Sequence, residues 1–84
     1  MNFYQRLTVA SKKILNQRDQ FKKSIAETGG DKITTADIRS ALYGLGFKTE
    51  MIDNIILRFM DHYETTYDSF MNKLQTFVKS YESL

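Results

Sequence analysis

The chain contains no cysteine, no proline and no tryptophan, and only four of its 84 residues are glycine. Without cysteine, disulfide bonds and cysteine-ligated zinc are excluded, so packing alone must stabilise the domain. Without proline, only the glycines interrupt helices, at Gly29-Gly30 and at Gly44 and Gly46. The sequence therefore permits helices almost everywhere outside these two places.

Long hydrophobic runs are also missing. No apolar stretch approaches the roughly 20 residues that a membrane-spanning helix needs, so no membrane span is expected. The N-terminal stretch "MNFYQRLTVASKKILNQ" lacks the uninterrupted apolar centre of a secretory signal, and a cytoplasmic location is expected. Its basic, amphipathic character leaves a mitochondrial presequence as an alternative. The length allows one small domain, residues 1–84.

Charge is unevenly distributed along the chain. The net charge is +2, but residues 1–23 carry +5 and residues 24–84 carry −3. The basic pI of about 8.9 therefore reflects the first segment and is not a nucleic-acid signature of the whole domain. The rest of the domain is mildly acidic, which suits a basic partner.

Helical periodicity runs through residues 3–28. The apolar positions follow spacings of three, four and seven residues, as one face of a helix requires; they are Phe3, Leu7, Ala10, Ile14, Phe21 and Ile25. Gln17 and Arg18 interrupt this face, so the segment is either one long helix or two. Gly29-Gly30 marks its end.

Three more helices are expected after residue 33. Thr34 and Asp37 of "TTAD" have the spacing of a capping box, and Gly44 and Gly46 stop the helix they begin. Thr49 is the expected N-cap of the next helix. "TTYD" repeats "TTAD" 31 residues later and should open the last one. The expected inward positions are Ile38, Leu42, Leu45, Ile52, Ile55, Ile56, Phe59, Phe70, Leu74, Phe77, Val78 and Tyr81.

The shift of 31 residues also relates Phe21 and Ile25 to Ile52 and Ile56. The chain is thus expected to contain two helix–loop–helix units, at about 10–46 and about 49–82. One such unit cannot cover its apolar face, but two can cover each other. The predicted fold is all-α, with four helices packed as a pair of pairs and an extended first helix.

The stretch "GGDKITTADIRSALYGLGFKTE" resembles the first EF-hand of calmodulin and the myosin light chains. It has a glycine-bearing loop, Ile33 at the eighth loop position, a threonine pair, an acid at the twelfth, a helix ending in "LG" and a Thr-Glu start to the next helix. The likeness covers about residues 21–60 and weakens toward residue 78. It implies a single calmodulin-type lobe, with Ile33 pairing its backbone near residues 63–66.

The calcium ligands of such a loop are largely missing. An EF-hand takes oxygens from loop positions 1, 3, 5, 7, 9 and 12, with Glu at position 12. With Ile33 at position 8, these positions are Ala26, Thr28, Gly30, Lys32, Thr34 and Asp37. The second loop has no better frame, whether it starts at Met60 or at Asp61. Calcium needs several hard oxygens, so no metal and no cofactor is expected.

A calcium-free lobe of this type can present an apolar groove to an amphipathic helix. The residues expected to line the groove are Leu42, Leu45, Phe47, Ile55, Phe59, Met60, Met71, Leu74 and Phe77. The resemblance implies a single-lobe light chain, like those on some class I myosins of amoeboid cells. Its partner would be the basic IQ-motif helix of an unconventional myosin heavy chain. The protein would then be a monomer before binding, cytoplasmic and associated with the cytoskeleton.

Other functions stay open or are disfavoured. No phosphate-binding loop, zinc spacing or Ser-His-Asp set is present, and the single histidine, His62, has no nucleophile beside it, so the chain is not expected to be an enzyme. A helix-turn-helix at "TTADIRSALYGLGF" lacks the basic and amide side chains of base readout, so no nucleic acid is expected as partner. A dimerising EF-hand module, of the calpain small-subunit kind, is the main alternative, and a calcium sensor or a helix-turn-helix nucleic-acid binder is less favoured.

Overall fold

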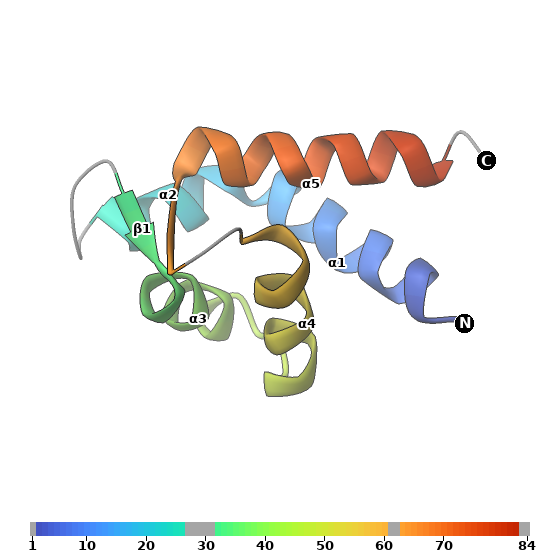
Figure 1. Ribbon diagram of the computed structural model, residues 1–84. Helices are drawn as coiled ribbons and strands as arrows, with labels where there is room; N and C mark the ends of the chain where they lie inside the picture. The colour runs from blue at the N-terminus through green and yellow to red at the C-terminus, as the bar shows by residue number, and fades with distance from the viewer. Residues whose placement is uncertain (1, 27–31, 61–62, 83–84) are drawn as a thin grey trace.

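The computed structural model describes residues 2–26, 32–60 and 63–82, and only the backbone of Ala26. In chain order the elements are α1 (Phe3–Asn16), α2 (Arg18–Ala26), β1 (Lys32–Thr34), α3 (Thr35–Gly44), α4 (Thr49–Phe59), β2 (Glu64–Thr66) and α5 (Tyr67–Glu82). The protein is mostly helical, with a small two-stranded sheet at one end (Figure 1). None of the helices described is long and apolar enough to cross a membrane.

The N-terminal segment forms two helices, so the described chain has five helices and the expectation of four is wrong. Gln17 separates them: it leaves the helical conformation with φ −110° and ψ 27°, and its N–H is shared between the carbonyls of Lys13 and Ile14. The chain then turns into α2, whose Phe21 N–H bonds the Gln17 carbonyl. The polar pair that interrupts the apolar periodicity is therefore a bend between two rigid segments.

The two strands join the halves of the molecule. They pair antiparallel, with Ile33 opposite Thr65 and Thr34 opposite Glu64, which confirms the expected pairing of Ile33 with residues 63–66. The Ile33 side chain is 1% exposed, so the link is anchored in the core as well as by backbone hydrogen bonds. Lys32 and Glu64 add an exposed ion pair at 3.5 Å.

The helix α3 begins and ends as predicted. The Thr34 hydroxyl accepts the Asp37 N–H at 3.2 Å, and the Asp37 carboxylate accepts the Thr34 N–H at 3.0 Å, which completes the capping box. The helix ends at Gly44. Gly46 then takes φ +91°, a left-handed conformation that glycine adopts without strain, and turns the chain toward α4.

Two predicted helix starts are displaced by one residue. The N-cap of α4 is Lys48, not Thr49, because the Thr49 hydroxyl bonds the Tyr43 hydroxyl at 2.7 Å instead of capping the helix. At the start of α5, the hydroxyl of Thr66 accepts the Ser69 N–H at 3.1 Å. The cap of α5 is thus Thr66, while the sequence repeat pointed to Thr65 with Asp68. The second strand and cap therefore follow the first by 32 residues.

One apolar cluster fills the space between the helices. Most of the predicted inward positions are buried in it, including Phe21 and Phe70, whose rings stack at 5.6 Å. Phe3 is an exception, because its side chain is 40% exposed at the start of α1. Ile56, Phe77 and Tyr81 lie at the edge of the core and are only partly buried. The apolar periodicity therefore identified the core except at these edges.

Candidate functional site

The expected groove is not open in this structure. Seven of its nine residues are buried in the core cluster, at 9% exposure or less; they are Leu42, Leu45, Ile55, Phe59, Met60, Met71 and Leu74. Phe47 and Phe77 are partly buried against the same cluster. The structure thus brings the nine residues into or against one apolar cluster, and another element covers part of that cluster.

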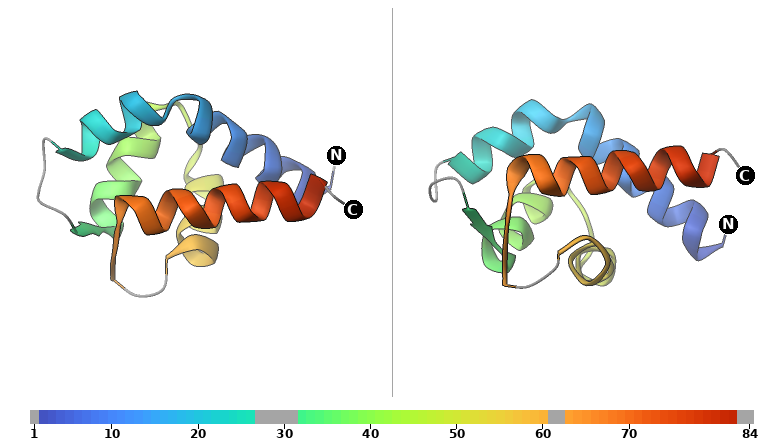
Figure 2. Two further views of the ribbon diagram at one scale, coloured as in Figure 1. Left: turned by 90° about the horizontal axis from the view of Figure 1, so that it is seen from above. Right: turned by 45° about the horizontal axis from the view of Figure 1, so that its top comes forward.

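The covering element is α1. It lies alongside α5 and also contacts α2 and α4 (Figures 1 and 2). Leu7 and Ile14 are fully buried and Ala10 is 4% exposed, and all three belong to the same cluster as the groove residues. Residues 2–20 are therefore part of the folded domain, and part of the apolar cluster expected for a partner is occupied from within the chain.

Two small polar side chains also lie buried on α1. Thr8 is 7% exposed, and its hydroxyl bonds the Tyr4 carbonyl of the preceding turn at 2.8 Å. Ser11 is fully buried, and its hydroxyl has no hydrogen-bond partner among the residues described. A buried hydroxyl without a partner lowers stability. The contact of α1 with the core is thus well packed at Leu7 and Ile14, but at Ser11 it leaves a buried hydroxyl unsatisfied.

Exposed contacts hold the rim of α1. Lys12 forms an ion pair with Glu82, and both side chains are about half exposed. The Lys13 ammonium lies 4.9 Å from the centroid of the Phe47 ring, and the Tyr4 and Tyr81 rings stack at 5.9 Å. Exposed ion pairs and cation–π contacts are individually weak. These contacts orient α1 on α5 and on the turn before α4 more than they hold it there.

A cleft opens between α4 and α5, beside the covered face. Its volume is about 750 Å³, and its walls include Arg58, Phe59, Lys73 and Phe77. The Arg58 guanidinium lies 5.1 Å from the Tyr4 ring centroid and 5.5 Å from that of Phe77, so it joins α4 to both α1 and α5. The cleft therefore presents the exposed Arg58 guanidinium beside the Phe77 ring, whereas Glu82 presents a carboxylate next to α1.

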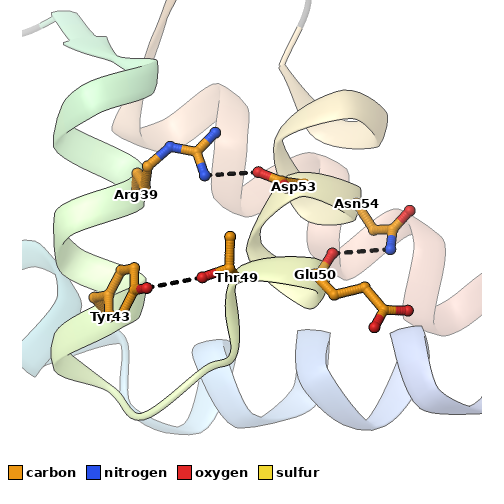
Figure 3. A network of polar contacts seen from close by, with 6 residues as sticks. All are labelled: Arg39, Tyr43, Thr49, Glu50, Asp53 and Asn54. Atoms are coloured by element: carbon orange, nitrogen blue, oxygen red, sulfur yellow. Dashed lines mark hydrogen bonds and ion pairs between the residues drawn. The ribbon is translucent and has the colours of Figure 1, made fainter.

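On the other side, polar contacts clip α3 to α4 (Figure 3). Arg39 and Asp53 form an ion pair at 2.6 Å, and the hydroxyls of Tyr43 and Thr49 bond at 2.7 Å. Each contact joins the two helices across the turn that contains Phe47. The ion pair and the hydroxyl hydrogen bond hold α3 and α4 together on one side of the apolar cluster.

The loop positions that would hold calcium make other contacts. Asp37, the one carboxylate of the first frame, caps α3, and Lys32 places an ammonium group in the same frame. In the second loop, Glu64 pairs with Lys32 and the Thr66 hydroxyl caps α5. Thr28, Gly30, Asp61 and His62 lie outside the described residues. Within the described part of the chain, no group of three or more acidic, histidine or cysteine side chains could hold a metal.

Tyr67 packs at the junction of α2 and α5. Its ring lies 6.3 Å from the Phe21 ring, and the Lys22 ammonium lies 5.1 Å from its centroid. Its hydroxyl points to the Arg18 carbonyl at 3.4 Å. Burial raises the pKa of Tyr67 above its ordinary value, with Arg18 opposing the shift and nearby carboxylates adding to it. The neutral phenol therefore belongs to the folded state.

Sequence reasoning missed three features of the covered face: the buried Ser11, the bridging Arg58 and the stacked pair of Tyr4 and Tyr81. The signal for the first was present, because Tyr4, Thr8 and Ser11 follow the helical spacing of four and three residues. A stripe of mixed polarity is easily taken for solvent-exposed surface. Comparison with protein-family models, with curated proteins and with solved structures finds no match.

Proposed function

We propose that this protein is a metal-independent, EF-hand-like lobe that binds a basic amphipathic helix, in the manner of a myosin light chain on an IQ-motif helix. The observation that carries the proposal is α1. It has three basic residues and no acidic one, and its apolar side is buried on the face that the groove residues form. The lobe accommodates a helix of this chemistry within its own chain.

The arrangement of the other elements supports the EF-hand part of the proposal. The units α2–β1–α3 and α4–β2–α5 each place a short strand between two helices, and the strands pair antiparallel at Ile33. Paired EF-hands share this order of helix, strand link and helix. The same order of elements occurs in this chain, with Ile33 in the core and a side-chain cap at the last residue of each strand.

The contacts at the loop ends support independence from calcium. Asp37 is engaged by the Thr34 N–H, and the Lys32 ammonium pairs with Glu64 across the sheet. A calcium ion would have to displace both contacts and then find several further oxygen ligands. The loop ends are thus closed by hydrogen bonds and an ion pair, and the lobe needs no ion to hold its helices.

The test is calorimetric titration of the full chain with a peptide that carries an IQ-type basic amphipathic helix. We expect micromolar or tighter binding in the presence of a chelator, and the same affinity after addition of millimolar calcium. The control peptide has the same apolar residues but glutamate in place of its basic residues, and it should bind more weakly. Failure of a panel of basic helical peptides to bind would refute the proposal, and binding only with calcium would refute its metal-independent part.

A further inference from the structure

We infer that the partner helix binds in the place of α1, and that α1 is an internal occupant that swings away on the bend at Gln17. This inference rests on the proposed function and specifies its site. It also specifies the partner. The partner is a basic amphipathic helix with large apolar side chains at the positions that Leu7, Thr8, Ser11 and Ile14 occupy on α1.

The exposed large apolar side chains of the described residues either belong to α1 itself or are scattered. Phe3, Tyr4 and Val9 lie on α1, whereas Tyr43 lies on α3, Leu57 on α4 and Tyr63 just before β2. The groove residues, in contrast, form one cluster, and α1 lies over it. The cluster that α1 covers is therefore a surface that already accommodates an amphipathic helix.

The bend at Gln17 lets α1 move independently of α2. Gln17 has non-helical backbone angles, and its N–H is shared between two carbonyls of α1. The Gln17 carbonyl accepts the Phe21 N–H of the first turn of α2. Rotation at this one residue moves α1 as a rigid body and leaves α2, β1 and the rest of the lobe in place, as hinges at element ends do.

The packing of α1 on the core is imperfect. Of its side chains only Leu7 and Ile14 are both large and buried, Ala10 and Thr8 are small, and the buried Ser11 hydroxyl has no partner in the part of the chain that the structure describes. The rim contacts at Lys12, Lys13 and Tyr4 are exposed to water. A helix with larger apolar residues at the positions of Thr8 and Ser11 would bury more area and leave no orphaned hydroxyl.

Charge supports the same partner. The ion pair of Lys12 with Glu82 shows that a basic residue at this position of the covering helix finds a carboxylate on α5. Arg58, which lies against the Tyr4 and Phe77 rings, would instead repel a basic residue placed beside it. A partner helix with basic residues near Glu82 and none near Arg58 therefore matches the charges that border α1.

The experiment uses the absence of cysteine. Lys12 and Glu82 are both replaced by cysteine in the full chain, and a bismaleimide with a cleavable linker joins them across the exposed ion pair. Fluorescence anisotropy then measures binding of the basic helical peptide before and after cleavage. We expect the tethered chain to bind at least about tenfold more weakly than the cleaved chain. The control tether joins cysteines at Lys32 and Glu64, an exposed pair remote from α1, and should leave affinity unchanged.

The outcomes separate this inference from the proposed function. Equal binding by tethered and cleaved chains would overturn the displacement of α1 and leave the proposed function standing. No binding by either chain, or by the unmodified protein, would overturn the proposed function and the inference with it. A concentration-dependent dimer of the unmodified protein in sedimentation, with no peptide binding, would assign the covered face to α1 of a second copy and overturn the partner proposed here.

Discussion

Replacing Ser11 with alanine should stabilise the protein. The side chain is fully buried and its hydroxyl has no partner among the described residues, a situation that costs about 1–3 kcal/mol. Alanine removes only the oxygen, so little empty volume results. Alanine also has a higher helix propensity than serine, by roughly 0.5 kcal/mol in a helix interior. Both terms raise the free energy of unfolding of Ser11→Ala.

The matched control is Ser40→Ala, because Ser40 is exposed in the interior of α3. This variant gains the higher helix propensity of alanine, but it removes no buried unsatisfied hydroxyl. Urea denaturation of the three proteins should place Ser11→Ala about 1–3 kcal/mol above Ser40→Ala in the free energy of unfolding. The corresponding rise in melting temperature is about 4–8 °C per kcal/mol for a domain of this size. If Ser11→Ala were no more stable than Ser40→Ala, the claim that the Ser11 hydroxyl is unsatisfied and destabilising would be refuted.

The remaining predictions concern the strand link, the cap of α5 and one titration. Ile33→Ala should cost about 2–5 kcal/mol in urea denaturation, because a buried side chain between the two halves is lost; a loss below 1 kcal/mol would contradict that burial. Thr66→Ala should lower the free energy of unfolding by about 0.5–2 kcal/mol, and Thr65→Ala by less, since the Thr66 hydroxyl caps α5. A larger loss for Thr65→Ala would instead identify Thr65 as the cap, as the sequence repeat predicted. Tyr67 holds its proton more tightly when folded, so its stabilisation is complete below pH 10.0 and is lost as the pH rises through the raised pKa. Absorbance at alkaline pH should therefore show one tyrosine that titrates later than the others, and this step should be missing in Tyr67→Phe. If all five tyrosines titrated without a shift, the raised pKa of Tyr67 would be refuted.

Local signals in the sequence predicted the strand link and the cap of α3 well. The Thr34 and Asp37 pair formed its capping box because both partners lie three residues apart and depend on nothing distant. Ile33 was placed by its position in a loop that resembles an EF-hand, and it is both buried and paired. Features that a short stretch of chain determines by itself were therefore accessible without the structure.

Features that depend on distant contacts were not accessible. Thr49 has the right chemistry for an N-cap, but the Tyr43 hydroxyl, six residues earlier, competes for it. The groove residues were identified as one apolar face, yet nothing local showed that α1 would cover that face. The covering depends on the bend at Gln17 and on α5, about sixty residues away in the chain. Periodicity reports that a face is apolar and not which element buries it.

The two-stranded link lies at the end of the molecule opposite the start of α1 and the end of α5 (Figure 1). Release of α1 would then be a partial opening, while the amides of β1 and β2 would lose their hydrogen bonds only when the whole domain unfolds. In hydrogen–deuterium exchange these two places would differ in opening free energy, with α1 lower. Such a molecule would keep its two-stranded sheet in every partly opened state and release α1 from the other end. The free energy of global unfolding would then be measured at the amides of the sheet, and not at those of α1.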